Sequence, residues 1–151
     1  MAYWLMKSEP DAYSIDQFKA EKKCLWDGIR NYQARNFMMK DMKVGDEFLF
    51  YHSNAKPPGV VGLGVINKPA VPDPSQFDKK SKYFDAKSQK DNPRWHCIEA
   101  KFKKKFKNMV SLNELKEEKA LKDMVLLNNS RLSIQPVTEK EFKHILNLLG
   151  E

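Results

Sequence analysis

The segment 95–106 constrains the fold most, because apolar and basic residues alternate along it. Two sets of alternate residues build its opposite faces, with Ile98, Ala100, Phe102 and Phe106 on one and Lys101, Lys103, Lys105 and Lys107 on the other. This period of two predicts a strand with one buried and one solvated face. Lys104 breaks the apolar side, which predicts a β-bulge or an exit of the strand from the core at that point.

Shorter segments of the chain also favour strands. We predict them at residues 1–7, 47–52, 60–66 and 132–135, from β-branched and aromatic content bounded by turn residues. The 60–66 segment has apolar residues or glycines on both faces, so it should lie inside its sheet. Gly62 and Gly64 begin like a dinucleotide-binding loop, but no helix follows, and we interpret them as places where a strand bends.

Helix starts carry a repeated local signal, the capping box flanked by an apolar staple. It occurs three times, at Ser14 with Gln17, Ser111 with Glu114, and Thr138 with Glu141. Asn31 is the predicted N-cap of a fourth helix over residues 32–42. Strands with scattered helices, and without regular strand–helix alternation, predict an α+β fold with a mainly antiparallel sheet. The segment 68–94, rich in Pro, Lys, Ser and Asp, is predicted to be a long surface excursion.

Length and charge narrow the function classes. A chain of 151 residues with a net charge of +7 is predicted to form one domain, residues 1–151, with an anionic partner. No apolar run approaches the roughly 20 residues of a membrane span, and the N-terminus lacks a secretory signal, so we expect a cytoplasmic protein, or a nuclear one in a eukaryote. The cysteines and histidines lack metal-ligand spacing, and we predict no metal and no cofactor.

Three groups of residues are candidates for contact with nucleic acid. The basic face of segment 95–106 fits either phosphate binding or simple solvation. Arg30, Asn31 and Arg35 cluster at a predicted helix N-terminus, where an anion is favoured, although Asn31 can equally serve as a cap. Trp26 and Asp27 would place a stacking face beside a hydrogen-bond acceptor, which suits a base with an exocyclic amine. The alternative for Trp26 is a place in the core.

Ordered motifs along nearly the whole chain resemble the EVE domain family. They are Tyr3-Trp-Leu-Met-Lys-Ser-Glu-Pro-Asp11, Trp26-Asp-Gly-Ile-Arg-Asn31, Gly45-Asp46 with Phe50-Tyr-His-Ser-Asn54, Pro58-Gly-Val-Val-Gly62, Pro72-Asp-Pro74 with Tyr83-Phe-Asp85, Pro93-Arg-Trp95 and Arg131-Leu-Ser-Ile-Gln-Pro136. The resemblance implies a PUA-like, partly open and mainly antiparallel β-barrel with about four peripheral helices. It also implies kinship with YTH and ASCH domains.

The resemblance further implies a pocket for a base. Its ligand-binding residues would be Lys7, Ser8, Glu9, Trp26, Asp27, Arg30, Asn31, Tyr51, Ser53, Asn54, Arg131 and Ser133. Arg35, Lys101, Lys103, Lys105 and Lys107 are additional candidates for phosphate contact. We expect a cavity bordered by Trp26, Asp27, Tyr51, Asn54 and Ser8.

The leading hypothesis is a module that recognises a modified base in DNA, of the modified-cytosine type and flipped out of the duplex. A binder of modified RNA bases is the first alternative, since PUA-like domains commonly serve RNA. An enzyme acting on a nucleotide or a small amide is the second, but no nucleophile paired with a base is visible in the sequence. Protein partners cannot be read from these patterns.

Overall fold

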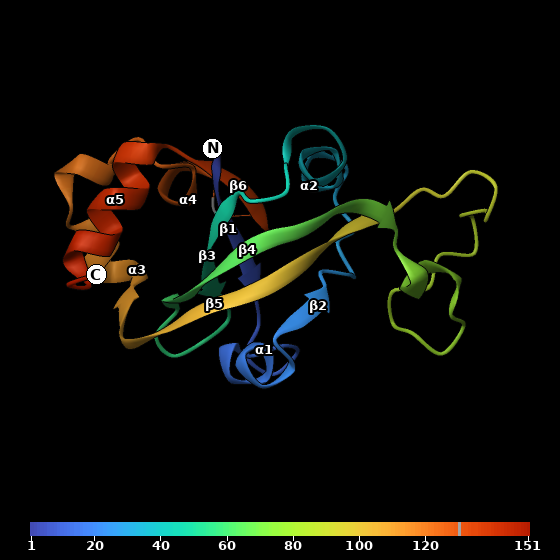
Figure 1. Ribbon diagram of the computed structural model, residues 1–151, viewed down its shortest axis with the longest axis horizontal. Helices are drawn as coiled ribbons and strands as arrows, with labels where there is room; N and C mark the ends of the chain where they lie inside the picture. The colour runs from blue at the N-terminus through green and yellow to red at the C-terminus, as the bar shows by residue number, and fades with distance from the viewer. Residues whose placement is uncertain (130) are drawn as a thin grey trace.

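The computed structural model describes residues 1–129 and 131–151, and within them six strands form one open sheet (Figure 1). The strands are β1 Tyr3–Ser8, β2 Lys23–Leu25, β3 Glu47–His52, β4 Gly59–Pro72, β5 His96–Ser111 and β6 Ile134–Val137. Their order is β2-β5-β4-β3-β1-β6, and every pair is antiparallel except β1 with β3. This arrangement confirms the predicted α+β class, and β4 lies inside the sheet as expected.

Helices surround this sheet, and the described residues hold five α-helices (Figure 1). They are α1 Ile15–Glu21, α2 Tyr32–Asn36, α3 Leu112–Lys116, α4 Val125–Asn128 and α5 Glu139–Leu148, with a π-helical turn Phe37–Asp41 after α2 and 3-10 turns at Pro74–Phe77 and Lys119–Leu121. All three predicted capping boxes form, and the side chain of Asn31 accepts from the Ala34 amide at 2.9 Å. The sequence analysis did not predict α4, because its N-terminus has no side-chain cap that would mark it in the sequence.

The sheet separates two hydrophobic cores, because neighbouring residues of a strand point to opposite faces. On β3, Phe48 and Phe50 join one core while Leu49 and Tyr51 join the other. We call the first the aromatic core, formed around Trp4, Phe18, Trp26, Phe48 and Phe50. We call the second the aliphatic core, formed around Leu5, Leu49, Leu115, Leu121, Met124 and Ile145. Helices α3, α4 and α5, which cover the aliphatic core, gather at one end of the molecule (Figure 1).

The bulge predicted at Lys104 is present and corrects one assignment. Gly64 pairs with Phe102, but the preceding Leu63 pairs with Lys104, so β5 carries an extra residue there. The extra residue reverses the facing of the positions that follow it, up to the next register shift, which lies between Lys105 and Val110. Phe106 was predicted to share a face with Ile98, and instead it packs in the aliphatic core.

The segment between β4 and β5 also departs from prediction at its start. The strand β4 continues to Pro72 and still pairs with β5 at His96, so the excursion begins only at residue 73. Beyond that point the chain loops away from the sheet (Figure 1). Buried Asp73 and Gln76 anchor its base, and Gln76 Nε2 donates to the Trp95 carbonyl at 2.8 Å.

In the described part of the chain, no helix is both long enough and apolar enough to cross a bilayer.

Candidate functional site

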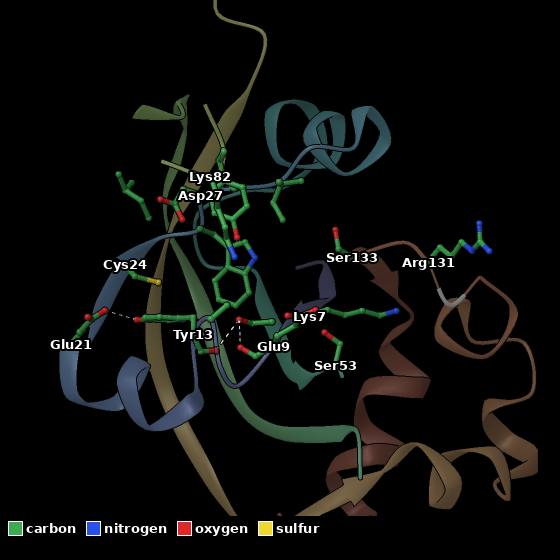
Figure 2. Close-up of a pocket in the computed structure, with 17 residues that line it drawn as sticks. Lys7, Glu9, Tyr13, Glu21, Cys24, Asp27, Ser53, Lys82, Arg131 and Ser133 are labelled. Atoms are coloured by element: carbon green, nitrogen blue, oxygen red, sulfur yellow. Dashed lines mark hydrogen bonds between the residues drawn. The ribbon is translucent and has the colours of Figure 1, made fainter. Parts of the chain in front are cut away.

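A cavity of about 700 Å³ opens beside the aromatic core (Figure 2). It lies where β1 ends, where β2 leads into segment 26–29, and where residues 82–83 of the excursion approach that segment. This volume suits a small organic ligand or a single nucleobase. The cavity is lined by Lys7, Ser8, Glu9, Ala12, Tyr13, Glu21, Cys24, Leu25, Trp26, Asp27, Gly28, Ile29, Ser53, Lys82, Tyr83, Arg131 and Ser133. Figure 2 shows Asp27 and Lys82 on one side of it, and Ser133 on another.

Trp26 forms the inner wall of this cavity and belongs to the core at the same time. Its side chain lies edge-on to Phe48 and Phe50, with ring centroids 5.5 and 5.4 Å apart, and the residue is 5% exposed. Its backbone amide donates to the Ile98 carbonyl at 2.9 Å. The core interpretation of Trp26 is therefore confirmed, while the stacking face stays a prediction that its place in the cavity lining supports.

A close contact between Gly28 and Tyr83 builds the outer wall. Gly28 has a φ of +79°, and a Cβ placed there would lie 2.6 Å from the Tyr83 ring. The Gly28 amide donates to Asp73 Oδ2 at 2.8 Å. Only glycine combines this backbone conformation with so close an approach of the ring. Tyr83 is thus held against the segment that carries Trp26 and Asp27.

Arg30 fixes that wall and is not itself a lining residue. Its Nη1 lies 3.1 Å from Asp73 Oδ2, and its Nη2 donates to the Tyr83 carbonyl at 2.7 Å and to Ser75 Oγ at 3.1 Å. Its guanidinium is 5.6 Å from the centroid of the Tyr83 ring. These contacts give Arg30 a positioning role, because they hold Tyr83 and Asp73 in place beside the cavity. Asn31 caps α2 and likewise lies outside the cavity.

Burial sets the charge state of the acidic groups around segment 26–30. Burial raises the pKa of Asp27, and the neighbouring charge of Asp73 raises it further. Burial also disfavours the charge of Asp73, yet hydrogen bonds from Ser75, Gly28 and Arg30 keep the pKa of Asp73 below its usual value. On the basic side, burial lowers the pKa of Lys7. The cavity therefore holds a carboxylate that is easier to protonate than usual and a lysine that is easier to deprotonate.

Tyr13, Glu21, Cys24 and Ser8 form a further part of the cavity lining. Tyr13 donates its hydroxyl to Glu21 Oε1 at 2.7 Å, and burial raises its pKa, so the phenol stays protonated. Burial also raises the pKa of the Cys24 thiol to about 11. Ser8 Oγ donates to the Tyr13 carbonyl at 2.8 Å, which ties β1 to the start of α1.

The structure gathers eight of the predicted ligand-binding residues around the cavity and leaves four outside its lining. Those brought together are Lys7, Ser8, Glu9, Trp26, Asp27, Ser53, Arg131 and Ser133, and those outside are Arg30, Asn31, Tyr51 and Asn54. The expected border of Tyr51 and Asn54 is therefore corrected. Tyr51 follows Phe50 on β3 and must face the aliphatic core, where it is 3% exposed. Asn54 instead hydrogen-bonds Glu9 at the rim.

The predicted phosphate-binding residues lie on other surfaces. Lys103 and Lys105 are exposed on β5 and form ion pairs with Glu47 and Asp16. Lys101 and Lys107 are exposed on the same strand. The bulge in β5 divides the predicted basic face, since Lys101 lies before the extra residue and Lys105 lies after it, and two of the four lysines pair with carboxylates of this protein. Arg35 lies apart from these lysines, on α2.

Sequence reasoning missed the lining residues Tyr13, Glu21, Cys24, Lys82 and Tyr83. Tyr83 had a usable signal, since it lies in one of the motifs that carry the family resemblance. Tyr13 precedes the Ser14 N-cap and occupies the apolar staple position of α1, where its ring packs on Phe18 with centroids 6.1 Å apart. Glu21 and Cys24 enter the cavity only through the folding of α1 onto β2, and no local pattern marks them.

Comparison with known proteins places these features in a family. The EVE domain model matches residues 2–148. Human thymocyte nuclear protein 1 is 45% identical, over 97% of this chain and 73% of that protein. A Pseudomonas syringae protein structure is 47% identical with a TM-score of 0.93, covering 97% of this chain and 99% of the other. The human THYN1 protein in complex with DNA containing 5-methylcytosine is 42% identical with a TM-score of 0.95, covering 100% and 99%. The chain belongs to the EVE domain family.

Proposed function

We propose that this protein binds DNA and recognises a modified cytosine, which enters the cavity beside Trp26 as a flipped base. The observation that carries the proposal is the match to the human THYN1 protein, which was crystallised with 5-methylcytosine DNA and is similar over the whole chain. The net charge of +7 supports a polyanionic partner. A cytosolic location, or a nuclear one in a eukaryote, remains our prediction.

The cavity offers the chemistry that a cytosine requires. Trp26 and Tyr83 supply apolar and aromatic surface for the ring and for a 5-methyl group. The Asp27 carboxylate is an acceptor suited to the exocyclic amine of cytosine. Lys7 and Arg131 supply positive charge at the opposite rim, where a backbone phosphate of the flipped nucleotide would lie.

We propose binding without catalysis. The Cys24 thiol, with a pKa of about 11, stays protonated near neutral pH and is a poor nucleophile. The Ser8 hydroxyl donates to a backbone carbonyl and so lacks the hydrogen bond to a base that would activate it. These two observations argue against Cys24 and Ser8 as activated nucleophiles.

The test is a binding series with duplexes that differ at one base. We expect a duplex with a single 5-methylcytosine to bind more tightly than its unmodified counterpart by about tenfold, or roughly 1.4 kcal/mol. Single-stranded DNA and a matched RNA carrying 5-methylcytosine complete the series. Equal affinity for methylated and unmethylated duplexes would refute the proposal, and tighter binding of the modified RNA would favour the RNA alternative.

A further inference from the structure

A second hollow lies away from the base cavity, between α2 and the end of the excursion. Its volume is about 380 Å³, and it is lined by Tyr32, Arg35, Lys87, Gln89, Asn92, Pro93 and Arg94. The lining is mostly polar and includes three cationic side chains and no carboxylate. We propose that this hollow binds a backbone phosphate of the DNA strand next to the flipped nucleotide, an inference that rests on the proposed function.

Arg35 lines this hollow, and hydrogen bonds hold its guanidinium in place. Its Nε and Nη2 donate to Asn36 Oδ1 at 3.2 and 2.9 Å, and its Nη1 donates to the Arg94 carbonyl at 2.9 Å. Its guanidinium lies 4.8 Å from the centroid of the Tyr32 ring. A guanidinium has five N–H donors, so these contacts leave one on each terminal nitrogen for a ligand. The pre-ordered guanidinium matches the geometry of a phosphate.

The charge of Arg35 is also not neutralised. Among the described residues, no carboxylate lies within ion-pair distance of Arg35, whereas Lys103 and Lys105 on β5 each have one. Exposed Lys87 adds a second cation to the hollow. Arg94 adds a third, although it shares its charge with Asp85 at 3.4 Å. An anion is the ligand that this set of groups would bind.

A chain of ring and guanidinium contacts joins this hollow to the base cavity. Tyr83 is 5.6 Å from Arg30, Arg30 is 5.3 Å from Trp95, and the Trp95 ring stacks on Tyr32 at 4.9 Å. Arg35 then lies over Tyr32. The Tyr32 ring thus contacts both Trp95 and Arg35, and the residue remains 54% exposed at the hollow. Successive phosphates of a strand lie about 3.4 Å apart along the duplex axis, and we place the phosphate of the hollow within a few nucleotides of the flipped base.

The experiment removes three positive charges from the hollow in one variant and three from a different surface in a control variant. The DNA affinities of the two variants are then compared. The first variant combines Arg35→Gln, Lys87→Gln and Arg94→Gln, and the control combines Lys116→Gln, Lys119→Gln and Lys140→Gln, all exposed near the C-terminal helices. Both variants lose the same net charge. We expect the first to bind an unmethylated duplex about tenfold more weakly, with a shallower dependence on salt by about one unit per lost phosphate contact.

Two further measurements keep the outcome decisive. Thermal unfolding of both variants checks the fold, and Lys87→Glu against Lys140→Glu repeats the comparison with exposed side chains outside any described ion pair. An equal loss in the two sets would show a net-charge effect only and overturn the inference, as would unchanged binding in the first set. The ratio of methylated to unmethylated affinity tests the proposed function separately, and we expect the first variant to retain that ratio.

Discussion

The two faces of the sheet are built from the same strands but end in different surfaces. The aromatic core packs its rings edge to face, with Trp26 against Phe18, Phe48 and Phe50, and it is closed by two short helices and by loops. The aliphatic core is closed by α3, α4 and α5. A cavity opens on the first face, and loops supply most of its polar lining. The comparison teaches that here the helical face supports the sheet while the loop-covered face carries the binding chemistry.

The largest expected effect separates the two cores. Trp26→Ala should lower the free energy of unfolding by about 3–5 kcal/mol, because a buried indole leaves a large void. Leu115→Ala, on the aliphatic face, should cost about 2–5 kcal/mol. Urea denaturation measures both, and DNA titration at low temperature measures the affinity of the folded molecules. We expect that affinity to be retained only in Leu115→Ala. Equal retention in both variants would contradict the assignment of binding to the aromatic face alone.

The next effect concerns the outer wall of the cavity. Gly28→Ala should cost about 1–2 kcal/mol for the left-handed backbone and about 1–3 kcal/mol more for the clash with Tyr83. Gly45→Ala is the matched control, since Gly45 has a φ of +98° and its added Cβ would meet no atom within 4 Å. We expect weaker binding of methylated DNA in Gly28→Ala alone. If both variants bind like the parent, Tyr83 is not part of the site.

A smaller effect concerns Asp27 and pH. Asp27→Asn should cost about 1–3 kcal/mol in discrimination between cytosine and other bases while leaving general DNA affinity intact. Because burial raises the pKa of Asp27, its carboxylate is lost as pH falls at a higher pH than the usual value of about 3.9. Affinity for methylated DNA should fall in that range. A raised pKa makes protonation of Asp27 favour the fold, so this loss is not caused by unfolding at that residue.

The pH titration has a direct control in the same variant. Asp27→Asn should show a flat affinity across the range in which the parent loses binding. A parallel loss in parent and variant would assign the titration to another group and remove Asp27 from the recognition of the base.

The smallest expected effect concerns the lysines of β5. Lys103→Gln should change DNA affinity by less than about threefold, because Lys103 already pairs with Glu47. Fluorescence anisotropy with an unmethylated duplex measures this change. A tenfold loss of DNA affinity would show that Lys103 contributes to DNA binding. It would contradict the assignment of binding mainly to the loop-covered face.

Local signals made most of the fold predictable. Capping boxes at Ser14, Ser111 and Thr138 depend on residues three positions apart, and all three form. The site was only partly predictable because its walls meet through long-range packing. Tyr83 is held at the cavity by Arg30 and Asp73, which are distant in sequence, and its motif marks the residue without showing which contacts place it. Tyr51 was misplaced for a simpler reason, since the period of two on β3 already placed it opposite Phe50.

The central claim is that the cavity on the aromatic face receives the methylated base. The most direct test is nuclear magnetic resonance of the protein bound to a duplex with one 5-methylcytosine whose methyl group is isotope-labelled. We predict nuclear Overhauser contacts from that methyl group to the side chains of Trp26 or Tyr83, with unperturbed signals from α5. Contacts to residues outside the cavity, or a methyl group that stays within the stacked duplex, would contradict the account.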